Sequence, residues 1–328
     1  MSRPVAIGII GCGRVTERYY LPAFVRLPEL RVVAVADRSE ARRVLVASRL
    51  RGCRAFASAE ALLDVASVEG IVVATPPDTH LAIAESALRR GLSAFIEKPL
   101  ARSDGEGDGW RALEAVADRP VMLGFNRRYW EPVRRLREIL RAQRQAPGIR
   151  ARLVMASNPQ GWGAISDGSD ALDDQGCHQL DLLRYLFDRE ATAVSARWTG
   201  PRSITMRVAL AGGVVAECVA AHHPAPQESI AVDCGGRSYR IRRGSERVQP
   251  AEGAWRAALD GLDTWQRRLR GQRSSLRRSY EEQFRRFARG IRSGAVPGPG
   301  LSDGIAALRL AQAARRSAAQ GGAEVAPA

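Results

Sequence analysis

The sequence predicts an α/β protein: an N-terminal doubly wound parallel sheet, followed by an α+β domain with a large, mostly antiparallel sheet. Up to residue 122, short apolar runs alternate with helical patterns, which is the order of βαβ units. Beyond it, segments of alternating apolar and polar residues separated by Gly-Gly turns are typical of antiparallel strands. The 328 residues are enough for two domains, which we expect at 1–122 and 123–328.

Composition indicates an ordinary globular protein, with 45% hydrophobic and 26% charged residues. Met1 runs almost directly into a strand-like segment, so we expect no signal peptide. No uncharged apolar run reaches the ~20 residues of a membrane span. We therefore expect a cytoplasmic protein without a membrane partner. Five scattered cysteines without a C-x-x-C pair predict reduced thiols and no metal site.

The net charge is +15, and most of the excess lies after residue 122. Much of it falls in helix-like stretches such as 267–292. Our interpretation is solvated arginine-rich helices and no specific nucleic-acid partner. A phosphate-bearing substrate or weak polyanion binding remains an alternative.

The elements of the first half follow from its apolar runs. Runs without alternation suit strands buried on both faces of a parallel sheet. They predict strands at 5–10, 31–36, 70–74, 92–96 and 121–125. Between them, helical spacing predicts helices at 16–27, 42–50, 59–65 and 110–117, and a further helix that ends at residue 90.

A glycine turn joins the first strand to the first helix. Gly11 allows the tight turn, and Gly13 lets the backbone approach a pyrophosphate at the helix N-terminus. The third glycine of such a fingerprint is replaced by Thr16. Strand, glycine turn and helix together predict a dinucleotide cofactor, and we place Arg14 and Val15 of the same turn beside it.

Asp37 ends the second predicted strand, close to the spacing expected of an acid that binds the adenosine ribose. An acid at this position favours NAD. Arg38 follows directly and could instead bind the 2′-phosphate of NADP. The sequence therefore favours NAD and leaves NADP open. The structural alternative for Asp37 is a cap on the next helix, a role that Ser39 could also fill.

Lys98 is the only lysine of the chain, whereas all other basic residues are arginine. Arginine does not lose its proton, while the pKa of a lysine ammonium shifts readily. Lys98 also follows a buried run and Glu97 directly, where open α/β sheets place their ligands. These features predict a functional lysine with Glu97 near the cofactor.

A proline-stiffened loop follows the third predicted strand. We expect Thr75 and Pro76 to contact the cofactor. His80, in the first turn of the next helix, is either a packed histidine or a neighbour of the cofactor.

The second half predicts a basic helix at 130–144, a strand at 150–156 and a glycine-rich loop at 161–168 over the site. A helix from residue 179 precedes an antiparallel meander with strands at 205–210, 214–220, 229–233 and 238–242. His222 and His223 read as the end of a strand. Helices at 255–292 and 301–319 close the chain.

Asp174 and His178 are four residues apart, so on a helix they share a face, as does Asp181. A carboxylate beside an imidazole is the arrangement of a general base near neutral pH. The structural alternative is a capping aspartate and a partly exposed histidine. Cys177 points about 100° away from His178 on such a helix, which argues against a Cys–His nucleophile.

Taken together, five motifs in this order resemble the Gfo/Idh/MocA family of nicotinamide-dependent oxidoreductases. They are 11–13, 75–80, 97–99, 126–128 and the Asp-x-Gly-x-His-x-x-Asp pattern of 174–181. The resemblance covers nearly the whole chain. It implies an N-terminal Rossmann domain, a C-terminal domain on a mostly antiparallel sheet, and a homodimer or homotetramer.

The resemblance also implies a reaction. His178 would take the proton of a substrate hydroxyl, Lys98 would stabilise the oxygen, and Asp174 would orient His178 or the substrate. Asn126, Arg127 and Asp181 would contact a sugar, cyclitol or related polyol, and the Lys98–Pro99 bond would be cis. Two alternatives remain: a reductase of a nucleotide-linked or phosphorylated keto-sugar, and a non-catalytic dinucleotide- or polyanion-binding protein.

Overall fold

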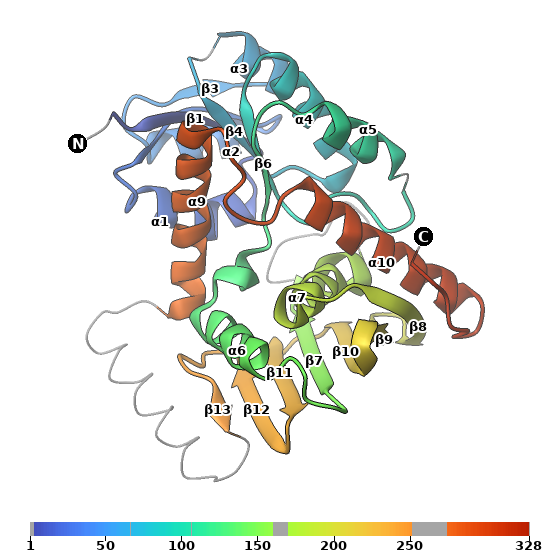
Figure 1. Ribbon diagram of the computed structural model, residues 1–328. Coiled ribbons are helices and arrows are strands. Elements are labelled where there is room, and N and C mark those ends of the chain that lie inside the picture. The colour runs from blue at the N-terminus through green and yellow to red at the C-terminus, as the bar shows by residue number, and fades with distance from the viewer. Residues whose placement is uncertain (1–2, 66, 106, 160–169, 251–273, 328) are drawn as a thin grey trace. The chain divides into compact units, whose positions relative to one another are not determined.

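The computed structural model describes residues 3–65, 67–105, 107–159, 170–250 and 274–327 (Figure 1). The chain forms two compact units: Met1–Phe125 with Tyr280–Ile305, and Asn126–Ser279 with Ala306–Ala328. The continuous part of the first unit thus ends three residues beyond the expected boundary at 122. The unit also includes Tyr280–Ile305, which come much later in the chain. The expected loop at 161–168 and the start of the expected helix at 255–292 lie outside the described residues.

The first unit contains a six-stranded sheet of order β3-β2-β1-β4-β5-β6, in which all neighbouring strands are parallel. The doubly wound fold predicted from sequence is confirmed. The chain order reverses between β1 and β4, which is where such sheets bind ligands at the carboxyl ends of the strands. The strands are β1 (Val5–Ile10), β2 (Leu30–Ala36), β3 (Arg54–Phe56), β4 (Gly70–Val73), β5 (Ser93–Ile96) and β6 (Val121–Leu123). Of these, β3 was not expected, because three residues are too short to show a pattern.

Helices connect these strands as expected, with one irregularity. The first helix opens with five residues of π-helix, η1, before the α-helical α1. The connections are η1 (Thr16–Tyr20), α1 (Leu21–Phe24), α2 (Glu40–Ser48), α3 (Ala59–Val65), η2 (Pro77–Thr79), α4 (His80–Arg89) and α5 (Asp108–Val116).

Helix α9 (Ser275–Ser293) contributes its later turns to the core of the first unit. Phe284 and Phe287 are three residues apart and therefore lie on one helix face. The Phe284 ring centroid lies 4.4 Å from that of Phe24 and 4.7 Å from that of Tyr20. In Figure 1 this part of α9 runs beside α1. Aromatic packing is thus the reason that residues far beyond 122 belong to the first unit.

The second unit is built on a seven-stranded sheet of order β13-β12-β11-β7-β10-β9-β8. Its neighbours are antiparallel except for β7 and β10, which are parallel. The expected uninterrupted meander is therefore corrected, since β7 lies between β10 and β11. The strands are β7 (Arg150–Ser157), β8 (Ala191–Gly200), β9 (Ser203–Leu210), β10 (Val214–His222), β11 (Gln227–Cys234), β12 (Arg237–Arg242) and β13 (Gln249–Pro250).

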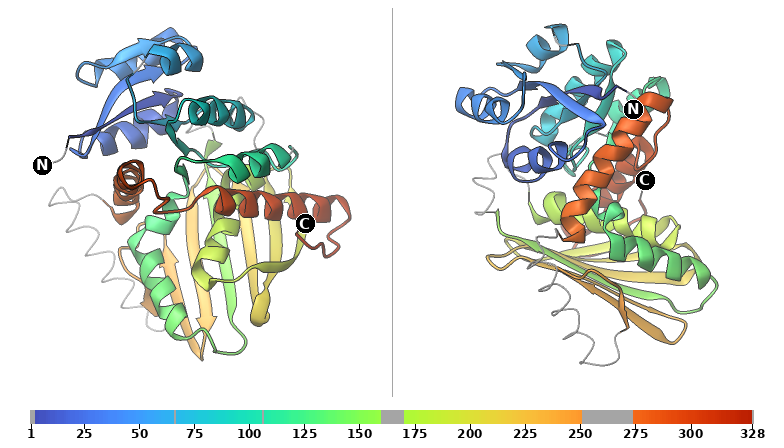
Figure 2. Two further views of the ribbon diagram at one scale, coloured as in Figure 1. Left: turned by 45° about the horizontal axis from the view of Figure 1, so that its top comes forward. Right: turned by 90° about the vertical axis from the view of Figure 1, so that its left-hand side faces the viewer.

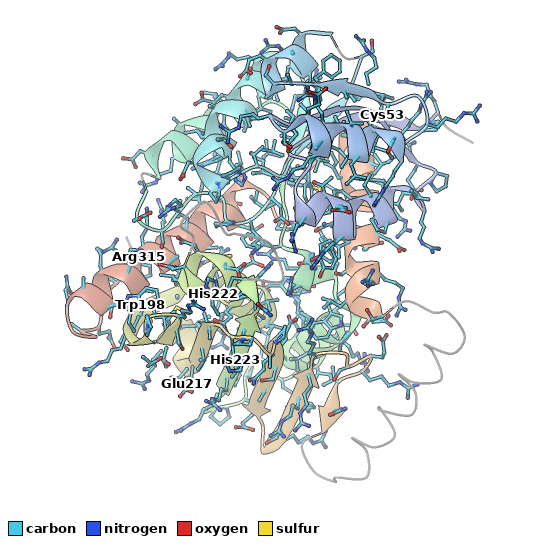
Figure 3. The ribbon with its side chains drawn as sticks, turned by 180° about the vertical axis from the view of Figure 1, so that it is seen from behind. Cys53, Trp198, Glu217, His222, His223 and Arg315 are labelled. Atoms are coloured by element: carbon cyan, nitrogen blue, oxygen red, sulfur yellow. The ribbon has the colours of Figure 1, made fainter. Side chains whose placement is uncertain are left out.

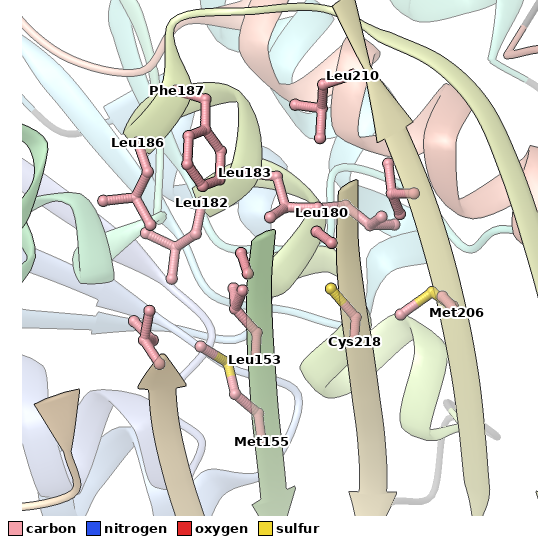
Figure 4. Packing of buried hydrophobic residues seen from close by; sticks show 14 of the residues in the cluster. Leu153, Met155, Leu180, Leu182, Leu183, Leu186, Phe187, Met206, Leu210 and Cys218 are labelled. Carbon is pink, nitrogen blue, oxygen red and sulfur yellow. The ribbon is translucent and has the colours of Figure 1, made fainter. Parts of the chain in front are cut away.

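Helices cover one face of this sheet, as Figure 2 shows for α6 and α7. Leu180, Leu183 and Phe187 of α7 are buried in one core with residues of β7, β9 and β10, as their shared helix face predicts (Figure 4). The remaining elements are η3 (Asn126–Tyr129), α6 (Glu131–Ala142), η5 (Leu172–Gly176), α7 (Cys177–Phe187), η6 (Ala211–Gly213) and α10 (Leu301–Ala319), which enters this unit at Ala306. In the described ranges, no helix is both long and apolar enough to span a bilayer.

Candidate active site

The glycine turn after β1 has the geometry that a bound dinucleotide requires. Gly11 has φ +102°, and a Cβ at this position would lie 2.3 Å from the carbonyl oxygen of Ala74. Any other residue would therefore be strained and would push β4 away. A Cβ on Gly13 would meet no atom within 4 Å, so the backbone is open to a ligand. The turn fits a pyrophosphate.

Thr16 fits the place of the missing third glycine through a hydrogen bond. Its buried hydroxyl donates to the Gly11 carbonyl oxygen over 2.7 Å, which ties the helix to the turn. From the sequence we expected two further residues of this turn beside the cofactor. Arg14 is exposed, and Val15 packs partly against the core of the first unit.

Asp37 holds backbone groups at the carboxyl end of β2. Its Oδ2 accepts the Cys12 N–H and its Oδ1 accepts the Ser39 N–H, each over 2.8 Å. Helix α2 starts at Glu40 after the cap residue Ser39, so Asp37 lies before the cap position. Its carboxylate links the glycine turn to β2, while the Arg38 side chain is exposed.

His80 supports the loop after β4 from the inside. Its side chain is fully buried, and Nε2 lies 2.9 Å from the carbonyl oxygen of Thr75. Burial lowers the pKa of His80, so the ring is neutral and Nε2 donates to this carbonyl. Thr75 is half-buried and Pro76 exposed, which leaves the loop itself accessible.

Glu97 organises the end of β5. Its Oε1 accepts the Tyr20 hydroxyl over 2.7 Å, and its Oε2 accepts the backbone N–H of Lys98. A Cβ on Gly124 would come within 2.7 Å of Oε2, so a glycine there makes room for the carboxylate. Lys98 is half-buried, and its bond to Pro99 is cis, as the resemblance implied.

Polar residues of three strands gather at one rim of the second sheet. Ser157 ends β7 and pairs in register with His222, the last residue of β10. Glu228 lies at the start of β11, opposite Met155 of β7. β10 ends at His222 and His223 follows it directly, so the two histidines lie at a strand end, as expected (Figure 3).

Asp174, in η5, contacts this rim. Its Oδ2 accepts the Ser157 hydroxyl over 2.6 Å and the Gln175 side-chain amide over 3.0 Å. The Nε2 atom of His222 lies 3.4 Å from the same oxygen. The structure thus links Asp174 to His222, a relationship that sequence spacing does not reveal.

His178 is 2% exposed, in contrast to the partly exposed histidine of the structural alternative. Its Nε2 lies 3.4 Å from NH1 of Arg127. Arg127 also binds Glu228 and the Asn126 side-chain oxygen. The second unit therefore places Asn126, Arg127 and His178 together.

Asp181, expected to contact the substrate, is 1% exposed and is held by Arg128. Arg128 NH2 lies 2.6 Å from Oδ1, and Nε lies 2.9 Å from Oδ2. This is a two-point pair, the strong form of an arginine–carboxylate interaction. It anchors α7 to η3, and the adjacent arginines after β6 were its only signal in the sequence.

Comparisons with known proteins agree with this architecture. Residues 5–125 match the model described as "Oxidoreductase family, NAD-binding Rossmann fold", and residues 150–326 match "Oxidoreductase family, C-terminal alpha/beta domain". The chain belongs to the Gfo/Idh/MocA oxidoreductase family. It is an NAD(P)-dependent oxidoreductase acting on CH–OH groups.

Inositol 2-dehydrogenase 4 of Saccharopolyspora erythraea is 24% identical over 332 residues, covering 95% of this chain and 93% of the relative. The crystal structure of myo-inositol 2-dehydrogenase from Lactobacillus plantarum has a TM-score of 0.81 at 19% identity, covering 99% and 100% of the two chains. That of the WlbA dehydrogenase from Bordetella pertussis, in complex with NADH and UDP-GlcNAcA, has a TM-score of 0.80 at 18% identity, covering 99% and 98%.

Two other features bear on chemistry in this member of the Gfo/Idh/MocA family: the state of the cysteine thiols and the grouping of possible metal ligands. Burial raises the pKa of the Cys12 thiol to about 12 and that of Cys53 to about 11, and burial raises that of Cys218 as well. Thiols that hold their protons are poor nucleophiles. In the part of the chain that the structure describes, no three His, Cys, Asp or Glu side chains group closely enough to hold a metal ion.

Proposed function

We propose that the protein uses NAD to oxidise a secondary hydroxyl of a cyclitol, sugar or related polyol to a ketone. The observation that carries this proposal is the buried His178, whose Nε2 faces an arginine that can only donate hydrogen bonds. An Nε2 atom that faces a donor presents its lone pair and can take a proton there. We assign His178 as the general base for the substrate hydroxyl.

The cofactor would be held by the glycine turn, with Gly11 and Gly13 at the pyrophosphate and Asp37 at the adenosine ribose. Arg14, Val15, Thr75 and Pro76 would flank it, with His80 and Glu97 supporting their loops from the inside. A nicotinamide held there would supply the acceptor for the hydride of the substrate carbon. The Arg38 side chain is exposed and could bind a 2′-phosphate. The neighbouring Asp37 carboxylate would repel that phosphate, which favours NAD over NADP.

Lys98 would stabilise the negative charge that develops on the substrate oxygen as the proton leaves. Asn126 and Arg127 would bind substrate hydroxyls, and Asp174 would orient the substrate or His178. Asp181, because Arg128 holds it, would act by fixing the helix that carries His178.

A neutral polyol fits the charges of the second unit better than a nucleotide-linked or phosphorylated keto-sugar. Arg127 and Arg128 each pair with a carboxylate that is less than a tenth exposed. Their charge is thus compensated before any substrate arrives. The likeness to WlbA, whose structure contains UDP-GlcNAcA, keeps the second substrate class as an outcome to test.

The face of the seven-stranded sheet opposite α6 and α7 is the surface through which we expect a homodimer or homotetramer to assemble in the cytoplasm. On this face, half-exposed Val154 and Val219 alternate with the exposed Arg152 and Glu217. Such a mixed surface suits contact between copies better than a polar one. Light scattering coupled to size-exclusion chromatography would give the mass in solution, and a monomer of 35.7 kDa would contradict the assembly.

The first experiment is a titration of the purified protein with NADH and NADPH, each followed by nicotinamide fluorescence at near-physiological salt. Tighter binding of NADH is expected. A panel of inositols, aldoses and other polyols then follows with NAD as oxidant, with uridine diphosphate added in parallel. Turnover of a polyol that uridine diphosphate does not inhibit supports the proposal. Salt-sensitive inhibition by uridine diphosphate would instead indicate a nucleotide-linked sugar as the substrate. If neither NADH nor NADPH binds, the proposed function is refuted.

A further inference from the structure

Arg127 makes a converging set of contacts at the rim of the second sheet. Its Nε lies 3.1 Å from Oε1 of Glu228, and its NH2 lies 3.5 Å from Oε2. Its NH1 donates to Oδ1 of Asn126 over 3.0 Å and lies 3.4 Å from Nε2 of His178. One guanidinium therefore connects two neighbours to the imidazole.

The chemistry of the guanidinium determines the state of the ring. Arginine carries only donors and keeps its proton at any pH a protein survives. Facing NH1, the Nε2 atom of His178 must act as the acceptor, which places the ring proton on Nδ1. At 3.4 Å the contact is long for a hydrogen bond, so a substrate hydroxyl can replace it.

Glu228 is well placed to fix this geometry. Its side chain is 6% exposed, and both of its oxygens face Arg127, whose side chain is 15% exposed. The carboxylate comes from β11, 101 residues along the chain from Arg127. An arginine side chain has several rotatable bonds, and ordering it has an entropic cost. A two-point contact to a strand residue restricts it to one orientation.

We propose that Glu228 is a positioning residue that acts through Arg127 to hold His178 as the neutral Nδ1–H tautomer, with the Nε2 lone pair available. The catalytic consequence rests on the proposed role of His178 as general base. The tautomer itself does not depend on that role.

The test is nitrogen NMR of the full chain labelled with 15N-histidine, recorded at pH 8. The chain has only four histidines, and His178→Asn identifies the signals of this ring. In the wild type, Nδ1 is expected to be protonated and Nε2 not. In Arg127→Met, which keeps an unbranched side chain without a donor, the population with a proton on Nε2 is expected to rise.

Glu228→Met tests the positioning role, because methionine has a similar volume but no charge. It should change the tautomer in the same direction as Arg127→Met, and the double variant should match Arg127→Met alone. Glu217→Ala is the matched control: this β10 carboxylate pairs with Arg152 of β7 over 2.8 Å, but both side chains are about half exposed or more. It should leave the tautomer unchanged.

A wild-type tautomer in folded Glu228→Met would overturn the proposal, as would an unchanged ring in Arg127→Met. Near-UV circular dichroism checks folding, and Glu228→Ala replaces Glu228→Met if the latter does not fold. Once a substrate is known, kcat of the Glu228 variant should fall about 10- to 100-fold, as for a displaced catalytic group. The NMR measurement needs neither cofactor nor substrate. An inactive wild type with the expected tautomer would therefore refute the proposed function and leave this inference standing.

Discussion

Tyr20 donates its hydroxyl proton to Glu97 over 2.7 Å, although 77 residues separate them in the chain. Tyr20 ends the π-helix that follows the glycine turn, and Glu97 accepts the backbone N–H of Lys98 with its other oxygen. Burial and the neighbouring Glu97 raise the pKa of Tyr20 well above its ordinary value, so the hydroxyl keeps its proton. The helix after the glycine turn and the backbone of Lys98 are therefore joined by one carboxylate.

Tyr20→Phe is expected to lower the free energy of unfolding by about 1–3 kcal/mol, because the buried Glu97 loses a donor. The phenylalanine ring keeps the contact with Phe284. Urea unfolding of Tyr20→Phe, Glu97→Gln and the double variant measures the coupling between the two side chains. Additive effects of the two single changes would show that the hydrogen bond contributes nothing.

Lys98→Arg is expected to fold normally and to lose at least ~100-fold in kcat, the lower end for a positioned acid–base group. The guanidinium is wider than an ammonium and cannot replace it as a compact charge. Steady-state kinetics and NADH titration of the same preparation separate turnover from cofactor binding. Turnover close to wild type would refute the assignment of Lys98.

Asp37→Asn is expected to reduce the preference for NADH over NADPH by about tenfold, equivalent to about 1.4 kcal/mol. The asparagine keeps an acceptor for the Cys12 N–H, so the glycine turn is retained while the charge that repels a 2′-phosphate is removed. Fluorescence titration with both cofactors measures the ratio of dissociation constants. A ratio equal to that of the wild type would mean that Asp37 serves only the backbone.

His80 should make the protein less stable in mild acid. Its pKa is lowered by burial in the folded state, so the unfolded chain binds the proton first as the pH falls. Stability is therefore full above the unfolded pKa of about 6.5 and declines as the pH falls from there toward the folded pKa. Urea unfolding at pH 7.5 and 5.5 should show a smaller difference in His80→Leu than in the wild type, by up to about 1.4 kcal/mol per pH unit. If the wild type and His80→Leu lose the same free energy of unfolding between these pH values, other residues cause the acid sensitivity.

Much of the first unit could be read from the sequence because its signals are local. A buried parallel strand is a run of apolar residues, and the turn at Gly11 needs a residue that tolerates positive φ. Both are properties of a few consecutive residues. The strands β1, β2, β4 and β5, the glycine turn and the position of Lys98 after β5 followed from these rules.

The partners of the charged and aromatic side chains, in contrast, depended on the tertiary structure. Glu228 meets Arg127 from 101 residues away, and the aromatic face of α9 returns to the first unit from beyond residue 280. The sequence alone singled out His178 and Lys98 as candidate catalytic residues, because the chemistry of an imidazole and of an ammonium is peculiar to these residue types. Which carboxylate compensates which arginine was decided only by the folded chain, since the cost of burying a charge is met by whichever partner the packing brings within hydrogen-bond distance.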